Sequence, residues 1–193
     1  FDPVTSLALA VSDVTVQDIA VDGTSVITPI YITKCTGCTV ERVNAKKAGL
    51  THGIIRIHES FDVTVINSRL TGALGKFGDG VYLENTARAK VAFNTINDFT
   101  RVGIVAEGSG GGKSSAILAQ GNNIYNGHDS ETTEFNSGVW FENTSSGRIL
   151  GNTVDDISGG AQANNSRGIT VASGGAAGSV FDVEDNQVSG AMH

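Results

Sequence analysis

Three glutamates recur in a shared sequence context. Glu84 and Glu142 each begin a Glu-Asn-Thr motif, and Glu107 begins the looser Glu-Gly-Ser. Two carboxyl groups can act as acid and base in glycoside hydrolysis, at a separation of about 5 to 5.5 Å in retaining enzymes and about 6.5 to 9.5 Å in inverting ones. We therefore treat Glu84, Glu107 and Glu142 as candidate catalytic residues. Asp79, which precedes a glycine of the same pattern, is a further candidate.

Aromatic and basic residues accompany these carboxylates. A flat ring can stack on the apolar face of a pyranose, while carboxylates accept hydrogen bonds from the sugar hydroxyls. The single tryptophan and two of the three tyrosines fall in this pattern. The candidate substrate-binding residues are Tyr31, Arg56, His58, Tyr82 and Trp140.

Two other interpretations of these residues stay open. Arg56 and His58 could serve a lyase or epimerase, in which a cation neutralises a uronate carboxylate before proton abstraction, although no second arginine stands in register. The repeated Glu-Asn-Thr could instead be a turn motif of a surface that binds without chemistry. The residues alone do not decide between these uses.

The candidates share one surface only if the chain folds as a repeat. A six-residue pattern with a polar fourth residue and a final Ile, Val or Leu occurs seven times, at 14–19, 38–43, 65–70, 91–96, 119–124, 149–154 and 183–188. Between the copies lies a second pattern of alternating apolar residues, at 30–32, 55–57, 80–83, 103–106, 138–141 and 168–171. The period of two is that of strands, and short strands repeating at intervals above about 20 residues are typical of a solenoid.

Stacking these repeats predicts which side chains become neighbours. Because side chains alternate across a strand, the residues between the apolar ones point outward. One outward column contains Tyr31, Arg56, Tyr82, Val105, Trp140 and Thr170, and the next contains Thr33, His58, Glu84, Glu107, Glu142 and Ala172. We expect the aromatic rings to be exposed. We also expect one glutamate to hold its proton more tightly, since like charges lie on neighbouring coils.

The polar position of the first pattern becomes asparagine in its last four copies. This column contains Asn94, Asn122, Asn152 and Asn186, with Gln17, Glu41 and Ser68 ahead of it. Asparagine tolerates left-handed backbone dihedrals, and stacked amides can hydrogen-bond along the solenoid axis. We interpret the column as turn chemistry rather than a binding site.

These patterns predict an all-β fold, a right-handed parallel β-helix of about seven coils. We expect residues 1–193 to form one domain and to be a fragment of a longer chain. The sequence begins at Phe1, so either processing removed the start or the chain is an excised fragment. The 25 glycines are accompanied by only two prolines, so collagen is excluded.

Composition also limits the partners. The net charge of -7 disfavours nucleic acid, whose binding depends on phosphate neutralisation. No apolar run approaches the length of a membrane span. Cys35 and Cys38 supply only two ligands, and they lie between strand-like runs, so we expect neither a metal nor another cofactor and predict Cys38 to be a buried apolar residue.

The repeats resemble those of the pectin-lyase-like superfamily of right-handed parallel β-helices, with its carbohydrate-binding and sugar-hydrolase repeats. The resemblance rests on Gly-Asn-x-Ile/Val turns at 121–124 and 151–154 and on the Gly-Val-x-Leu/Phe-Glu-Asn-Thr strands at 80–86 and 138–144. It implies work on an extracellular polysaccharide. The Gly-His-Gly of polygalacturonases and the Asp-Pro-His of mannuronan epimerases are absent. The remaining similarity is to bacteriophage tailspikes and polysaccharide depolymerases.

That resemblance implies a secreted or virion-surface protein, in which three chains often associate into a homotrimer. The sequence therefore predicts a polysaccharide-binding glycoside hydrolase of depolymerase type. A uronate lyase or epimerase and a non-catalytic adhesive solenoid are the alternatives.

Overall fold

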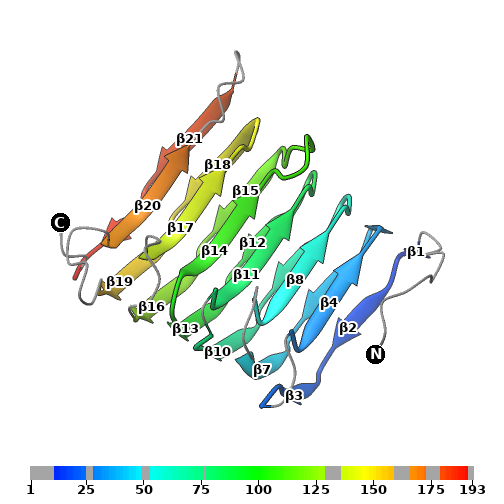
Figure 1. The fold of residues 1–193 in the computed structure, drawn as a ribbon, viewed down its shortest axis with the longest axis horizontal. Coiled ribbons are helices and arrows are strands. Elements are labelled where there is room, and N and C mark those ends of the chain that lie inside the picture. The colour runs from blue at the N-terminus through cyan, green and yellow to red at the C-terminus, as the bar shows by residue number, and fades with distance from the viewer. Residues whose placement is uncertain are drawn as a thin grey trace.

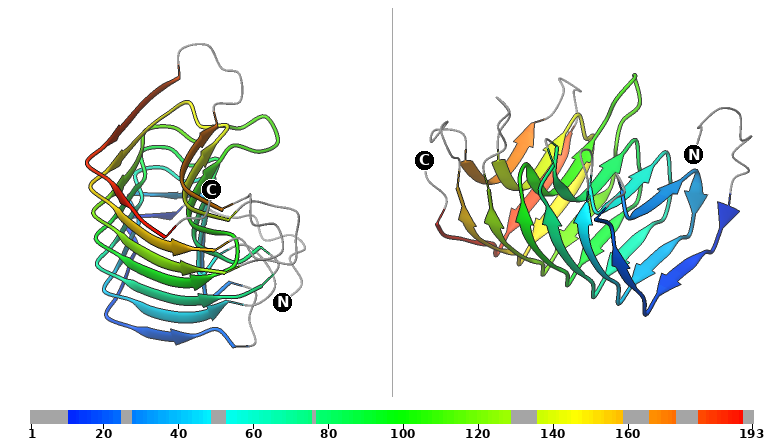
Figure 2. Two further views of the ribbon diagram at one scale, coloured as in Figure 1. Left: turned by 90° about the vertical axis from the view of Figure 1, so that its left-hand side faces the viewer. Right: turned by 60° about the horizontal axis from the view of Figure 1, so that its bottom comes forward.

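The computed structural model describes residues 11–24, 28–48, 53–75, 77–128, 136–158, 166–172 and 179–190. These residues form short strands joined by turns. The strands lie in a stack of similar coils, as Figure 1 and Figure 2 show. Within the described ranges we find no helix that is long and apolar enough to cross a membrane.

Three parallel sheets run along the stack, and each successive coil adds one strand to each sheet. The first sheet contains β2 (Thr15–Gln17), β6 (Thr39–Glu41), β9 (Thr64–Ile66), β12 (Lys90–Ala92), β15 (Ile117–Gln120), β18 (Ser146–Leu150) and β21 (Val180–Glu184). The second contains β3 (Ala20–Asp22), β7 (Asn44–Ala48), β10 (Arg69–Ala73), β13 (Thr95–Phe99), β16 (Asn123–Gly127), β19 (Thr153–Ile157) and β22 (Gln187–Val188).

The third sheet contains β4 (Ile30–Thr33), β8 (Ile55–His58), β11 (Asp79–Glu84), β14 (Val102–Glu107), β17 (Asn136–Glu142) and β20 (Ser166–Ala172). A short pair, β1 (Val11–Ser12) with β5 (Cys35–Thr36), completes the strands. The predicted all-β parallel β-helix is confirmed. The third sheet has six strands, so β21 and β22 begin a coil with no third strand among the described residues, and the expected seven coils are not all complete.

The inward side chains of the three sheets form one continuous apolar core. Val40, Val65, Val91, Ala119 and Ile149 occupy equivalent positions in the first sheet, and each is buried. Branched aliphatic residues suit this position because they pack well on the pleated, half-buried surface of a strand.

The asparagine column forms a hydrogen-bonded ladder between the first and second sheets. Asn94 Nδ2 donates to Asn122 Oδ1 at 3.0 Å, and Asn122 Nδ2 donates to Asn152 Oδ1 at 2.9 Å. Asn152 Nδ2 continues the ladder to Asn186 Oδ1 at 2.9 Å. Ser68 stands one coil earlier, where its backbone N donates to Asn94 Oδ1. The predicted stacking of amides along the axis is confirmed. The expected left-handed backbone is not found at the column residues; it occurs one residue earlier in each coil, at Asn67, Phe93, Gly121, Gly151 and Asp185.

The two earliest members of the predicted column are wrong. Gln17 pairs with Glu41, and Glu41 pairs with Ile66, so both lie two residues away from the position of Ser68. The residue that matches Ser68 in the preceding coil is Val43, whose backbone N donates to Ser68 Oγ at 3.1 Å. A slip of two residues preserves the alternation of inward and outward side chains, so hydrophobic pattern alone does not detect it.

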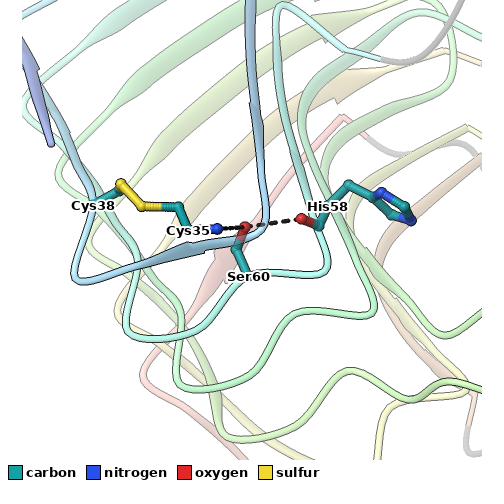
Figure 3. The surroundings of a disulfide bond; sticks show 4 residues. All are labelled: Cys35, Cys38, His58 and Ser60. Carbon is teal, nitrogen blue, oxygen red and sulfur yellow. Dashed lines mark hydrogen bonds between the residues drawn. A yellow bond between two sulfur atoms is a disulfide. The ribbon is translucent and has the colours of Figure 1, made fainter. Parts of the chain in front are cut away.

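Cys35 and Cys38 form a disulfide at the corner that follows β4 (Figure 3). Both residues are buried, as predicted for Cys38, but they are bonded to each other rather than packed as separate apolar side chains. The backbone N of Cys35 donates to Ser60 Oγ at 3.1 Å, and Ser60 Oγ donates to the carbonyl of His58 at 2.8 Å. The disulfide is thus tied to the strand that carries His58.

Candidate functional site

The outward face of the third sheet brings the predicted site residues into register. Tyr31 pairs with Arg56, Arg56 with Tyr82, Tyr82 with Val105 and Val105 with Trp140. In the second column, His58, Glu84, Glu107 and Glu142 pair in that order. The predicted alignment of both columns is confirmed.

Glu84 is held by groups that favour its ionised form. Arg56 Nη2 lies 2.7 Å from Glu84 Oε2, and Ser109 Oγ donates to Glu84 Oε1 at 2.6 Å. His58 Nε2 lies 3.9 Å from Glu84 Oε2. Burial alone raises the pKa of Glu84, but the Ser109 hydrogen bond and the Arg56 cation outweigh it and place the pKa below its ordinary value. Glu84 is therefore a carboxylate at neutral pH.

Glu107, on the next strand, is shifted in the opposite direction. Burial raises the pKa of Glu107 above its ordinary value, and the charges of Glu142 and Glu84 add to this effect. Arg101 and the hydroxyl of Tyr82, which donates to Glu107 Oε2 at 3.2 Å, oppose it without cancelling it. One glutamate holds its proton more tightly, as predicted, although burial contributes more than the like charges do.

The predicted exposure of Tyr82 is wrong, because its side chain is only 4% exposed and packs with Val102 and Val105. The guanidinium groups of Arg56 and Arg101 lie over its ring, at 5.5 and 5.7 Å from the centroid. Burial, followed by the charge of Glu107, raises the pKa of Tyr82, so its hydroxyl remains a hydrogen-bond donor.

The other rings of the column differ in exposure. Trp140 is partly buried against the cluster of Tyr82, Val102 and Val105. Tyr31 is 53% exposed and lies 5.4 Å from the guanidinium of Arg56. Tyr31 is therefore the ring on which a sugar can stack with least rearrangement.

Asp79 does not reach the exposed face. Its carboxylate is fully buried and accepts two hydrogen bonds from Arg101, at 2.9 Å from Nε and 2.8 Å from Nη2. Arg101 was not among the sequence candidates. Arg101 directly precedes β14, in the coil after that of Asp79. Its position beside a strand of the predicted outward column is the sequence feature that could have indicated it.

The candidate residues lie on neighbouring strands of the third sheet. Two hollows in the structure lie elsewhere, one over the first sheet at Leu118 and Arg148 and one at the corner formed by Gly121 and Gly151. Among the residues that the structure describes, no group of three or more His, Cys, Asp or Glu side chains could hold a metal ion.

Comparison with known families agrees with the geometry. The family model described as a right handed beta helix region matches residues 8–192. The chain thus belongs to the right-handed β-helix family, which is consistent with the predicted pectin-lyase-like superfamily. No significant match was found among curated proteins or among solved structures.

Proposed function

We propose that this protein is a glycoside hydrolase that degrades an extracellular or cell-surface polysaccharide, with Glu107 as the acid and Glu84 as its partner carboxylate. One observation carries the proposal: two glutamates on neighbouring strands have pKa values displaced in opposite directions. Such a displacement gives identical side chains different roles, a protonated acid and an ionised nucleophile.

The spacing of the strands favours a retaining mechanism. Neighbouring strands lie about 4.8 Å apart, which is closest to the carboxyl separation of about 5 to 5.5 Å in retaining enzymes. Protonated Glu107 gives its proton to the glycosidic oxygen as that bond breaks, and Glu84 bonds to the anomeric carbon. Water, deprotonated by Glu107, then displaces Glu84 and restores both groups. Glu142 assists through its charge, which helps to keep Glu107 protonated.

The remaining candidates supply substrate contacts. Exposed Tyr31 offers a stacking platform, and Arg56 and His58 lie beside Glu84 at the edge of the same face. The buried disulfide supports a secreted or virion-surface location, since such bonds persist in oxidising environments. We also propose that three chains associate into a homotrimer, as in the depolymerases that the sequence resembles.

The experiment measures reducing ends released from a panel of neutral and acidic polysaccharides. On a polymer that the wild type degrades, Glu107→Gln and Glu84→Gln should each lower kcat by about 10²- to 10⁴-fold, the contribution typical of a positioned acid or base. Glu184→Gln, at an exposed glutamate on the first sheet, is the control and should leave kcat unchanged. Full activity in Glu107→Gln contradicts the proposal, and binding of a polymer without cleavage by the wild type favours an adhesive solenoid.

A uronate lyase is the second candidate. Partly exposed Arg56, on the outward face beside Glu84, supports it, because a cation there could neutralise a substrate carboxylate. A lyase forms an unsaturated product that absorbs in the near ultraviolet, whereas hydrolysis does not. Recording absorbance during the same assays distinguishes the two reactions.

A further inference from the structure

A buried chain of contacts leads from Asp79 to the proposed acid. Asp79 binds the guanidinium of Arg101 through two hydrogen bonds. That guanidinium lies 5.7 Å from the centroid of the Tyr82 ring and 5.9 Å from that of Phe77. The hydroxyl of Tyr82 then donates to Glu107 at 3.2 Å. Each group in the chain contacts the next, and the first three are almost fully buried.

We propose that Arg101, held by Asp79, is a positioning residue that acts on Glu107 through the ring of Tyr82. The inference rests on the proposed function in one respect, the assignment of Glu107 as the acid. It gives Asp79 a different role from the catalytic one expected from the sequence, since Asp79 orients Arg101 and does not meet substrate.

The arrangement needs the guanidinium geometry rather than its charge alone. A planar fork can bind both carboxylate oxygens and at the same time lie over an aromatic ring, and lysine cannot reproduce this. With Asp79 fixing the fork, the guanidinium groups of Arg101 and Arg56 both lie over the Tyr82 ring and limit its movement. The hydroxyl is then directed at Glu107 before any substrate arrives, which is how a supporting group preorganises a catalytic one.

Several charges face Glu107 and must be considered together. Arg101 and the Tyr82 hydroxyl favour its ionised form, while Glu84 on β11 and Glu142 on β17 disfavour it. Asp79 opposes Arg101 at the far end of the chain. A substitution that changes only orientation can therefore be separated from one that changes only charge.

The test is an NMR titration of the Glu107 side-chain carboxyl, assigned by its loss in Glu107→Gln, and it requires no substrate. Tyr82→Phe removes the hydroxyl and should raise the titration midpoint by about half a pH unit, as expected for one lost hydrogen bond to a carboxylate. Arg101→Lys keeps the charge but loses the fork, and it should raise the midpoint by a similar amount. Arg42→Lys, at a second two-bonded but exposed Arg–Asp pair, is the matched control and should leave the midpoint unchanged.

The double variant identifies the route. If Arg101 acts through Tyr82, Tyr82→Phe combined with Arg101→Lys shifts the midpoint no further than the larger single change. Should Arg101→Lys fail to fold, Asp79→Asn replaces it. The positioning role predicts that this variant raises the Glu107 midpoint, because Arg101 is no longer held in place. Loss of the Asp79 charge alone would lower the midpoint.

An unchanged midpoint in Arg101→Lys, additive shifts in the double variant, or a lowered midpoint in Asp79→Asn overturns the positioning role. Shifted midpoints in a protein that cleaves no polysaccharide support the positioning role and overturn the proposed function. Cleavage of a polysaccharide together with unshifted midpoints supports the proposed function and overturns the positioning role.

Discussion

Glu84 and Glu107 are the same residue type on neighbouring strands, and their surroundings separate them chemically. Glu84 forms an ion pair with Arg56 and accepts a hydrogen bond from Ser109. Glu107 accepts a hydrogen bond from the Tyr82 hydroxyl and lies near the charges of Glu84 and Glu142. The difference arises from what each side chain contacts across the coils. It follows that the two residues should respond differently when they are neutralised.

Neutralising each glutamate should change stability with opposite dependence on pH. The folded pKa of Glu84 is depressed, so its contribution to stability is present above the unfolded pKa and is lost as pH falls through the folded value. The folded pKa of Glu107 is raised, so stability decreases as pH rises through that value. At pH 7, Glu84→Gln should lower the free energy of unfolding and Glu107→Gln should raise it.

Unfolding by guanidinium chloride at pH 7 and pH 3 measures the free energy of unfolding of both variants. At pH 3 the destabilisation caused by Glu84→Gln should shrink, because the glutamate it replaces is then losing its charge. Equal destabilisation by both variants at pH 7 would show that the surroundings do not distinguish the two carboxyl groups.

The sequence predicted that the site residues align in two columns, but it did not predict which side chains cover them. Period-two alternation places Tyr82 away from the main core, yet it contains no information about whether another side chain then covers it. Arg101 and Ser109 lie in turns outside the repeated strands, so the repeat could not point to them. These two residues determine how Tyr82 and Glu84 are held.

At the scale of the elements, the asparagine ladder joins the coils where the first and second sheets meet. Asn122 is buried, its Nδ2 donates to the carbonyl of Val91 at 2.9 Å, and its Oδ1 accepts from the backbone N of Asn94 at 3.0 Å. Asn122→Ala leaves both groups without this partner. Since an unsatisfied buried group costs about 1 to 3 kcal/mol, the free energy of unfolding should fall by about 3 kcal/mol.

Thermal or denaturant unfolding checks this value. Asn123→Ala, at the exposed neighbouring position in β16, is the control. It should lower the free energy of unfolding by about 0.5 kcal/mol at most, as is usual for surface changes. Similar losses in the two variants would mean that the ladder adds no stability beyond that of a surface amide.

The elements themselves were predictable because local pattern and global fold agree. Strand type, parallel pairing and the later members of the ladder follow from alternation and from the repeated turns. The register of Gln17 and Glu41 did not follow, because a two-residue slip leaves the same faces inward. The disulfide did not follow either, since the spacing of Cys35 and Cys38 fits several uses.

For the whole molecule, stability should vary along the solenoid axis. Val183 pairs with Ile149 in the first sheet, yet Val183 is 48% exposed and Ile149 only 1%. Val14 and Ile19, at the other end of the described stack, are also exposed. Because each coil contacts only its neighbours, a terminal coil has a partner on one side alone.

Amide hydrogen exchange should therefore be slowest in the central strands β11, β14 and β17 and fastest in β2, β3, β21 and β22. Mass spectrometry of peptic fragments can resolve this gradient. Uniform protection from end to end would indicate that the terminal coils are covered in solution.

The most direct test of the proposed activity is a crystal structure of Glu107→Gln with an oligosaccharide from a polymer that the wild type degrades. The sugar chain should lie along the third sheet, with one ring stacked on Tyr31 and a glycosidic oxygen within hydrogen-bond distance of residue 107. An oligosaccharide bound on another sheet, away from Glu84 and residue 107, would contradict the assignment of this face as the site of cleavage.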